Sequence, residues 1–249
     1  NRISRIIISR AAGAICGMVS NEPPFLEDER RVIAASMFGN TTDCVNICVE
    51  LLEARGFEVL VFHATGSGGR TMESLISDGL VDAVLDITTT EWADELCGGI
   101  FNAGPNRLTA AGAMGIPQVV VPGCIDMVNF GALDTVPPQY RKANRLLYEW
   151  NPAITLMRTN VEENKKLGNI FSEKLNLSRG PVACLLPTRG ISILDGDGEL
   201  FCDREADDAF AVELKNKLRS DISIEELDCN INDPEFATRA VEMLLQLMK

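Results

Sequence analysis

The residues with the clearest chemical potential are three glycines in the segment Ala64-Thr-Gly-Ser-Gly-Gly69. An apolar run, Val59 to Phe62, precedes this segment, and helix-forming residues from Arg70 to Ser77 follow it. Glycine lets the backbone turn sharply and come close to a ligand. A strand, a glycine turn and a helix start in this order gather free N–H groups at the positive end of a helix dipole. The pattern predicts either a site for a phosphate or carboxylate, or simply a tight strand-to-helix connection.

The glycine turn matches neither of two common phosphate-binding motifs. It lacks the Lys-Ser/Thr pair of a P-loop, and its spacing is not that of the dinucleotide-binding fingerprint. Any bound anion would therefore be held by the turn and the first helical residues. The predicted ligand-binding residues of this segment are Thr65, Gly66, Ser67, Gly68, Gly69, Arg70 and Thr71.

Polar residues also follow three other predicted strands, where they would line the walls of the same site. In a parallel sheet, ligands bind beyond the carboxyl ends of the strands. Thr88 and Glu91 also have the spacing of a capping box, which would open a helix that runs to about Gly98. The predicted wall residues are Gly39, Asn40 and Thr41, then Thr88, Thr89, Thr90 and Glu91, and finally Asp126 and Asn129.

His63 is the only histidine of the chain, and it stands at the mouth of the glycine turn. The pKa of an unperturbed histidine lies near neutrality, so this side chain is a candidate general acid or base. A single histidine at a strand end is as often a packing residue. No Ser-His-Asp arrangement can be argued from the spacing of residues.

Several charged residues near the strand ends offer further chemistry. Asp86, Glu91, Asp94 and Asp126 can hold a Mg²⁺ ion that bridges nucleotide phosphates, but Glu91 can equally cap a helix and Asp94 face solvent. No firm metal site is predicted. Arg70 and a second arginine, Arg158, can pair with phosphate oxygens or lie on the surface.

Alternating strand and helix patterns must position these residues. From Arg31 onward, short apolar runs alternate with helical segments, which predicts an α/β fold. We expect a three-layer Rossmann-like domain with a mostly parallel sheet of about six strands. The predicted strands are 32–37, 59–62, 82–87, 118–121, 182–186 and 222–227. The predicted helices are 43–54, 70–77, one that the Thr88–Glu91 capping box opens and that ends near 98, 106–114, 140–149, 161–176 and one that begins at 233–235.

The first 30 residues are expected to form a linker segment from a preceding α/β half, and residues 31–249 the second half. Arg5 to Ser9 are predicted as a short strand and Ala11 to Val19 as a helix. The chain does not begin with Met and shows no signal-peptide pattern, so we expect it to be part of a longer protein.

Composition narrows the function classes. The net charge of −13 argues against nucleic-acid binding, which needs a basic surface. No apolar run of the sequence approaches the ~20 residues of a membrane span, so no membrane contact is expected. The eight cysteines are scattered and contain no CxxC pair. Buried, reduced thiols in a cytoplasmic protein are therefore predicted.

The chain also resembles the Tm-1-like family. The resemblance rests on five stretches in this order: 62–70, 85–91, 126–131, 157–166 and 231–233. It covers nearly all of residues 10–249 and implies the second half of a region of two α/β halves that binds ATP and dimerises. In many members a TIM-barrel domain follows this region.

The resemblance and the glycine turn together predict a module that binds a nucleotide, with ATP, alone or with Mg²⁺, as the expected cofactor. A homodimer and a possible protein partner are also expected. One alternative is a module whose function is protein interaction or dimerisation. The other is a hydrolase or transferase that acts on a phosphorylated or carboxylated small molecule, with His63 as acid or base. The sequence holds no complete catalytic set, which favours binding over catalysis.

Overall fold

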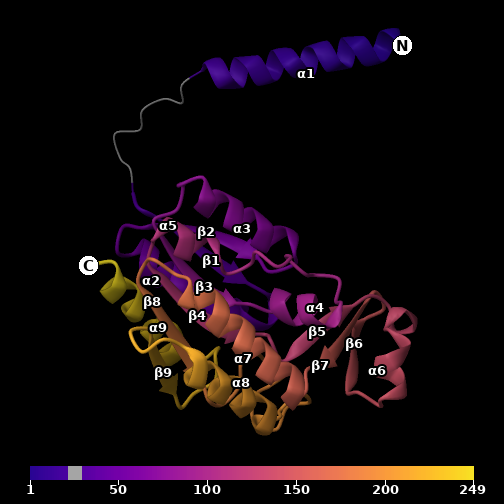
Figure 1. Ribbon diagram of the computed structural model, residues 1–249, viewed down its shortest axis with the longest axis vertical. Coiled ribbons are helices and arrows are strands. Elements are labelled where there is room, and N and C mark those ends of the chain that lie inside the picture. The colour runs from indigo at the N-terminus through magenta and orange to yellow at the C-terminus, as the bar shows by residue number, and fades with distance from the viewer. Residues whose placement is uncertain (22–29) are drawn as a thin grey trace. The chain divides into compact units, whose positions relative to one another are not determined.

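The computed structural model describes residues 1–21 and 30–249. The chain divides into two compact units, Asn1–Arg30 and Arg31–Lys249 (Figure 1). Residues 22–29 of the predicted linker lie outside the described residues.

The first unit contains one continuous helix, α1 (Arg2–Ser20). The predicted strand at Arg5 to Ser9 is therefore wrong. The β-branched run Ile6 to Ile8 suggested a strand, but the side chain of Asn1 accepts a hydrogen bond from Ser4 N at 2.9 Å and caps a helix. By length and composition α1 could cross a membrane: it has 19 residues and a mean hydropathy of 1.4. The absence of membrane contact remains a prediction.

The second unit is built on a six-stranded parallel sheet, which confirms the predicted Rossmann-like α/β fold. The strand order is β2-β1-β3-β4-β8-β9. Central strands β3, β4 and β8 are buried along their whole length, as expected for strands covered on both faces. The strands are β1 (Val32–Met37), β2 (Glu58–His63), β3 (Ala83–Thr88), β4 (Gln118–Gly123), β8 (Val182–Pro187) and β9 (Ser223–Leu227).

Helices cover both faces of this sheet (Figure 1). Alternate side chains of each strand point to opposite faces. Ile33 and Leu85 pack with α2 and α9, whereas Ala34 and Val84 pack with α3 and α5. Further along the second face lie α7 and α8, whose residues pack with Val120 and other side chains. The helices are α2 (Thr42–Glu53), α3 (Ser67–Ser77), α4 (Glu91–Cys97), α5 (Ala110–Met114), α7 (Val161–Asn176), α8 (Arg204–Lys217) and α9 (Pro234–Leu247).

A smaller antiparallel sheet extends beyond β4 and forms an arm that the sequence did not predict. Its order is β5-β7-β6, with β5 (Met127–Phe130), β6 (Leu147–Asn151) and β7 (Ile154–Arg158). The helix predicted for 140–149 is wrong, because α6 (Pro138–Lys142) ends early and Asn144 adopts a positive φ of 51°. The short helices η1 (Gly39–Thr41) and η2 (Leu133–Thr135) follow β1 and β5.

The cysteines largely follow the prediction. All eight are free, and six of them are buried. Cys202 is half-buried and Cys16, on α1, is exposed.

Candidate functional site

The strand order places the predicted site residues at one edge of the sheet. The chain runs outward from β1 to β2 and returns to β3 on the other side of β1, so the order reverses between β1 and β3. In open α/β sheets, ligands bind at the carboxyl ends of the strands beside such a reversal. Here those ends carry η1 after β1 and Thr88 to Glu91 after β3. The hydroxyls of Thr41 and Thr88 join the two strand ends at 2.7 Å.

The glycine turn connects β2 to α3 through very close backbone contacts. Gly66 has a φ of 82°, a conformation that other residues rarely adopt. A Cβ at Gly68 would lie 1.8 Å from the backbone oxygen of His63, and one at Gly69 would lie 2.0 Å from Oε2 of Glu91. All three glycines therefore have a structural reason to be glycine, independent of any ligand.

The carboxylate of Glu91 occupies part of the predicted anion cradle. Its Oε1 accepts hydrogen bonds from Gly66 N at 2.7 Å and from Gly69 N at 3.1 Å. The predicted capping box with Thr88 is therefore wrong, because this carboxylate turns away from its own helix to the start of α3. The α4 N-cap residue is Thr90, and it forms no side-chain capping bond. The turn does bind an anion, and that anion is a side chain of the same protein.

Arg107 holds Glu91 in place and was not singled out from the sequence. Its side chain is 1% exposed, and its Nε donates to Glu91 Oε2 at 2.7 Å. The two terminal nitrogens donate to both oxygens of Asp86 at 2.5 and 2.6 Å. Glu73 accepts a longer bond of 3.3 Å and also accepts bonds from three backbone N–H groups at the start of α5. The guanidinium therefore links β3, α3 and α4 within the core, and Glu73 extends the link to the start of α5.

One signal could have revealed this network. Asp86 lies in the middle of a strand that is otherwise apolar, Ala83 to Thr88. A carboxylate in a fully buried strand needs a cationic or hydrogen-bonding partner. Nothing in the sequence spacing identifies Arg107 as that partner, because the loop that carries it has no regular pattern.

The outer side of the glycine turn remains open. His63, Ser67, Arg70 and Thr71 are exposed, and Gly68 is half-buried. Within residues 1–21 and 30–249, the backbone N–H groups of Ser67 and Gly68 form no hydrogen bond. Arg70 lies beside them and donates to the backbone oxygen of Asn102 at 2.8 Å. These groups form a surface with two free N–H donors and one accessible cation.

A half-buried aromatic pair lies near this surface. Phe38, which follows β1, meets Phe101 edge to face with ring centroids 6.2 Å apart. The backbone oxygens of Phe101 and Asn102 lie against Gly66, close enough to exclude a Cβ there. The aromatic pair therefore borders the same end of the glycine turn.

The predicted wall residues Asn40, Asp126 and Asn129 are all buried. Asn129 donates from its backbone N and from Nδ2 to Asp94 Oδ1, at 2.7 and 3.1 Å. Asn40 Nδ2 donates to the sulfur of Met127 at 3.4 Å. One side-chain oxygen of each of the three wall residues lacks a donor in the described part of the chain.

Burial changes the acidity of two carboxyls near the strand ends. Desolvation raises the pKa of Asp94 to about 7, although its hydrogen bonds from Asn129 and Phe101 oppose this rise. Desolvation also raises the pKa of Asp126 to about 6, and the nearby guanidinium of Arg158 partly offsets it. Arg158 itself is 5% exposed and pairs with Asp195 and Asp207, so its guanidinium does not lie on an open surface.

The four candidate metal carboxylates do not converge. Asp86 and Glu91 pair with Arg107, and Asp94 accepts bonds from Asn129 and Phe101. Asp126 accepts a bond from Ser192. Over residues 1–21 and 30–249, no group of three or more His, Cys, Asp or Glu side chains is placed to hold a metal ion.

Comparisons with known proteins agree on one family. Residues 30–248 match the C-terminal domain of the Uncharacterised protein family UPF0261. A UPF0261 protein of Clostridium tetani is 50% identical over the whole chain, which covers 61% of that relative. A UPF0261 protein of Mesorhizobium japonicum is 43% identical, with 62% of its length covered. The ToMV resistance protein Tm-1(GCR237) of Solanum lycopersicum is 40% identical over 99% of this chain and 33% of its own length. The chain thus spans less than two thirds of these relatives.

Proposed function

We propose that this chain, which belongs to the UPF0261 family through the C-terminal domain that spans residues 30–248, binds a nucleotide at the carboxyl edge of its parallel sheet. The observation that carries this proposal is the pair of free N–H groups of Ser67 and Gly68 at the start of α3. An 11-residue helix offers its positive end there, at the type of edge where α/β sheets bind ligands. The ligand class is ATP or a chemically similar phosphate compound.

The phosphates would bind on the outer side of the glycine turn. The inner N–H groups of Gly66 and Gly69 already hold Glu91, so a phosphate would take those of Ser67 and Gly68. Arg70 is exposed beside them and can turn from Asn102 to a phosphate oxygen.

The charge behind the turn favours a nucleotide that carries a metal ion. Arg107 supplies one positive charge, whereas Glu73, Asp86 and Glu91 supply three negative charges. This excess would repel a free triphosphate. Mg²⁺ bound to the phosphates would reduce that repulsion without needing a cage of protein ligands. We therefore propose the Mg²⁺ complex of the nucleotide as the bound species.

The base would lie against the aromatic pair. Phe38 and Phe101 are half-buried and border the glycine turn. Stacking on an aromatic ring contributes ~1–3 kcal/mol per base and does not depend strongly on which base is bound. This arrangement predicts weak discrimination between adenine and guanine nucleotides.

Calorimetric titration of the chain with ATP, ADP, AMP and inorganic phosphate, each with Mg²⁺, tests this proposal. We expect saturable binding that weakens as phosphates are removed. Ser67→Glu should abolish binding, because its carboxylate would lie where the phosphate binds, while the helix dipole stabilises that carboxylate and preserves the fold. Ser67→Ala keeps the N–H group and should bind normally. No binding to the folded wild-type chain, or equal binding to both variants, would refute the proposed phosphate site.

The arm supports a second candidate function, which is association with another protein chain. In the sheet order β5-β7-β6, the outer edge of β6 has no strand partner within the described residues. Tyr148 and Trp150 on this strand are 36% and 48% exposed, and Leu146 just before it is 42% exposed. Aromatic residues of this kind often anchor interfaces, and an unpaired strand edge can pair with another strand. We propose this edge as the homodimer contact.

Sedimentation analysis of the chain and two variants distinguishes a specific dimer through this edge from non-specific association through exposed apolar side chains. Trp150→Glu should shift a dimer toward the monomer. Leu177→Glu changes a side chain that is 77% exposed at the end of α7, and should leave the dimer intact. A wild-type monomer at all concentrations, or a dimer that withstands Trp150→Glu, would count against this edge.

A further inference from the structure

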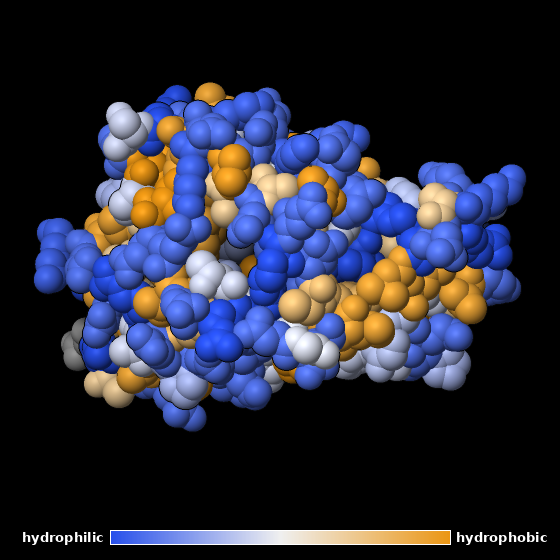
Figure 2. Space-filling view, turned by 90° about the horizontal axis from the view of Figure 1, so that it is seen from below, coloured by the Kyte–Doolittle hydropathy of each residue, from blue (hydrophilic) through white to orange (hydrophobic). Residues whose placement is uncertain are grey.

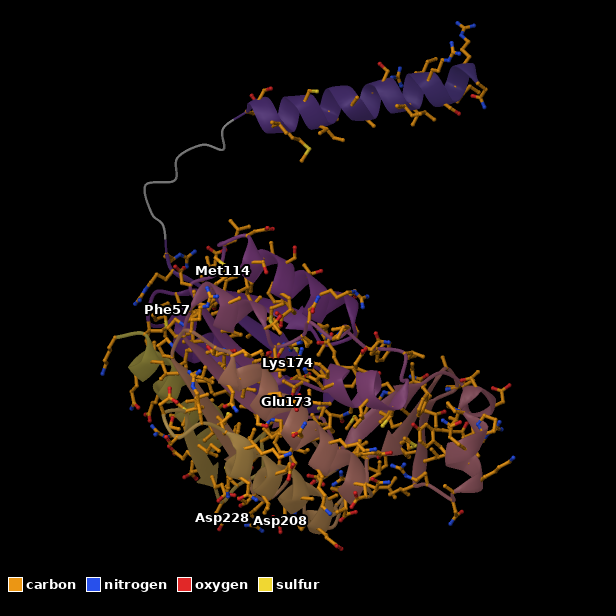
Figure 3. All side chains as sticks on the ribbon, in the orientation of Figure 1. Phe57, Met114, Glu173, Lys174, Asp208 and Asp228 are labelled. Carbon is orange, nitrogen blue, oxygen red and sulfur yellow. The ribbon has the colours of Figure 1, made fainter. Side chains whose placement is uncertain are left out.

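A small cavity lies at the carboxyl ends of β4 and β8, apart from the glycine turn. Its volume is about 30 Å³, enough for a water or a head group of one or two heavy atoms. Its lining includes the apolar side chains of Ile125, Leu186 and Phe210. Asp208 and Glu226 contribute to its lining, and Asp208 projects at the lower end of the domain (Figure 3). Figure 2 shows the molecule from below, and the face seen there is mostly hydrophilic.

Asn164, which lines this cavity, is 0% exposed and has one oxygen with no donor. The orientation of its amide is fixed by its neighbours. Thr159 Oγ1 donates to the backbone oxygen of Ile125 at 2.8 Å and therefore must accept from Asn164 Nδ2 at 3.0 Å. The second hydrogen on Nδ2 goes to the backbone oxygen of Asn160 at 3.0 Å. Both amide hydrogens are used, so the atom left without a partner is the acceptor Oδ1.

A second buried oxygen in the same polar network also lacks a donor. Asp126 accepts a hydrogen bond on Oδ2 from Ser192 at 2.8 Å, while its Oδ1 has no partner within the described ranges. Its backbone oxygen accepts from Thr159 N at 2.9 Å, which ties it to the residue that orients Asn164. The network therefore has unused acceptors on both sides of Thr159.

The guanidinium groups of Arg158 and Arg204 balance the carboxylates of this network, and desolvation raises the pKa of Asp195 to about 8. Arg158 pairs with Asp195 and Asp207 at 3.2 and 2.7 Å, and Arg204 pairs with the same two carboxylates at 3.1 and 2.7 Å. The guanidinium of Arg158 also acts on the carboxyl of Asp126 and lowers its pKa, against the larger effect of burial. At the rim, Lys215 pairs with Glu226, but Asp208 has no ion-pair partner in the part of the chain that the structure describes.

We propose that this cavity binds a small primary ammonium group, with Asn164 Oδ1 as its acceptor and the carboxylate of Asp208 as its counter-charge. An ammonium group brings N–H donors to the unused acceptor of Asn164, and a positive charge to a lining in which Asp208 has no ion-pair partner among the described residues. The apolar side chains of the lining suit a short alkyl group on the nitrogen. No group of three or more metal-ligating side chains is formed in the described residues, which disfavours a metal cation. A water would supply donors but no charge.

Methylammonium is the probe that matches the cavity, because it has two heavy atoms and one charge. Calorimetric and NMR titrations of the chain with methylammonium chloride, at constant ionic strength, should show saturable binding and a shift of the Asn164 side-chain amide signals. Tetramethylammonium has the same charge but no N–H donor and is too large, so it should not bind. Potassium chloride controls for a simple response to a monovalent cation.

Two variants and one control locate the site. Asn164→Leu removes the acceptor and should weaken methylammonium binding at least tenfold. Asp208→Asn removes a counter-charge at the exposed rim without affecting the fold, and should weaken binding about threefold. Asn169→Ala, on the same helix α7 but bonded to Glu173 and Lys217, should leave binding unchanged.

Several outcomes would overturn the proposal. Absence of saturable methylammonium binding would show that the cavity holds an ordered water only. Equal responses to tetramethylammonium or potassium would show non-specific cation binding. If Asn164→Leu does not fold, an unchanged affinity in Asp208→Asn would be decisive against the site.

Discussion

At the scale of single residues, Arg107 is a buried cation that links several elements of the domain. It is buried among three carboxylates, and two of them, Asp86 and Glu91, are themselves buried. Its removal would leave carboxylates in the core without a counter-charge. Such a loss costs far more than the loss of an exposed ion pair.

We expect Arg107→Met to lower the free energy of unfolding by ~3–5 kcal/mol, because the methionine fills the space but pairs with no carboxylate. Urea denaturation measures this loss. Arg70→Gln is the matched control, since Arg70 is exposed and bonds one backbone oxygen, and it should change stability by under ~1 kcal/mol. Equal changes in the free energy of unfolding for the two substitutions would show that the buried ion pairs of Arg107 do not stabilise the domain.

The carboxyl of Asp126 should make stability depend on pH. Burial raises its pKa from 3.8 to about 6 in the folded chain. Between these values the folded chain keeps a proton that the unfolded chain has lost, so stability must fall as pH rises from about 4 to about 6. The expected total is ~3 kcal/mol, because each pKa unit corresponds to ~1.4 kcal/mol.

Asp126→Asn should remove this part of the pH dependence, because the amide does not titrate and keeps nearly the same shape. Denaturation of both proteins at several pH values between 4 and 7 measures it. Asp78→Asn, at an exposed position, serves as control and should follow the wild type. Parallel pH profiles for wild type and Asp126→Asn would contradict the raised pKa.

At the scale of elements, the connection from β2 to α3 is defined by backbone contact. A Cβ at Gly68 would meet the backbone of His63, whereas a Cβ at Gly39 would meet nothing within 4 Å. Gly68→Ala should therefore destabilise the domain by ~2 kcal/mol or more, and Gly39→Ala should not. Thermal unfolding compares the two. A stable Gly68→Ala would mean that this turn adjusts easily, and substitution at this position could then report on ligand binding alone.

Four of the strands that were predicted correctly share one property, and one strand that was missed lacks it. Strands β1, β3, β4 and β8 are continuous apolar runs, since both faces of the sheet are covered, and such runs are visible in a sequence. Strand β6 is exposed on both faces, and its residues Leu147 to Asn151 carry no regular apolar pattern. It was therefore predicted as part of a helix.

The candidate site also shows which contacts a sequence does not reveal. Sequence reasoning placed the glycine turn correctly between β2 and α3, because strand, turn and helix are adjacent in the chain. It could not pair Glu91 with Gly66, or Arg107 with Asp86, since both pairs are more than 20 residues apart in sequence. Local patterns indicate which residues reach the edge of the sheet, whereas the contacts between them depend on the packing of separate elements.

At the scale of the whole molecule, all four apolar clusters lie within residues 32–248. Helix α1 contributes no buried residue. A chain that begins at Arg31 should therefore unfold cooperatively, with a melting temperature within about 2 °C of that of the full sequence, since the same core is retained. Differential scanning calorimetry tests this. A decrease of more than about 5 °C would show that residues 1–30 stabilise the folded domain.

The position of α9 in the core has a consequence for biosynthesis. Phe236, Val241 and Leu244 complete the cluster that covers Ile33 and Leu85 from the first strands of the sheet. Until the ribosome has added these helical residues, this part of the face of β1 and β3 has no cover. That face stays uncovered until α9 has been synthesised, and exposed apolar strands aggregate readily. A nascent chain of this protein should therefore depend on chaperones until α9 has left the exit tunnel.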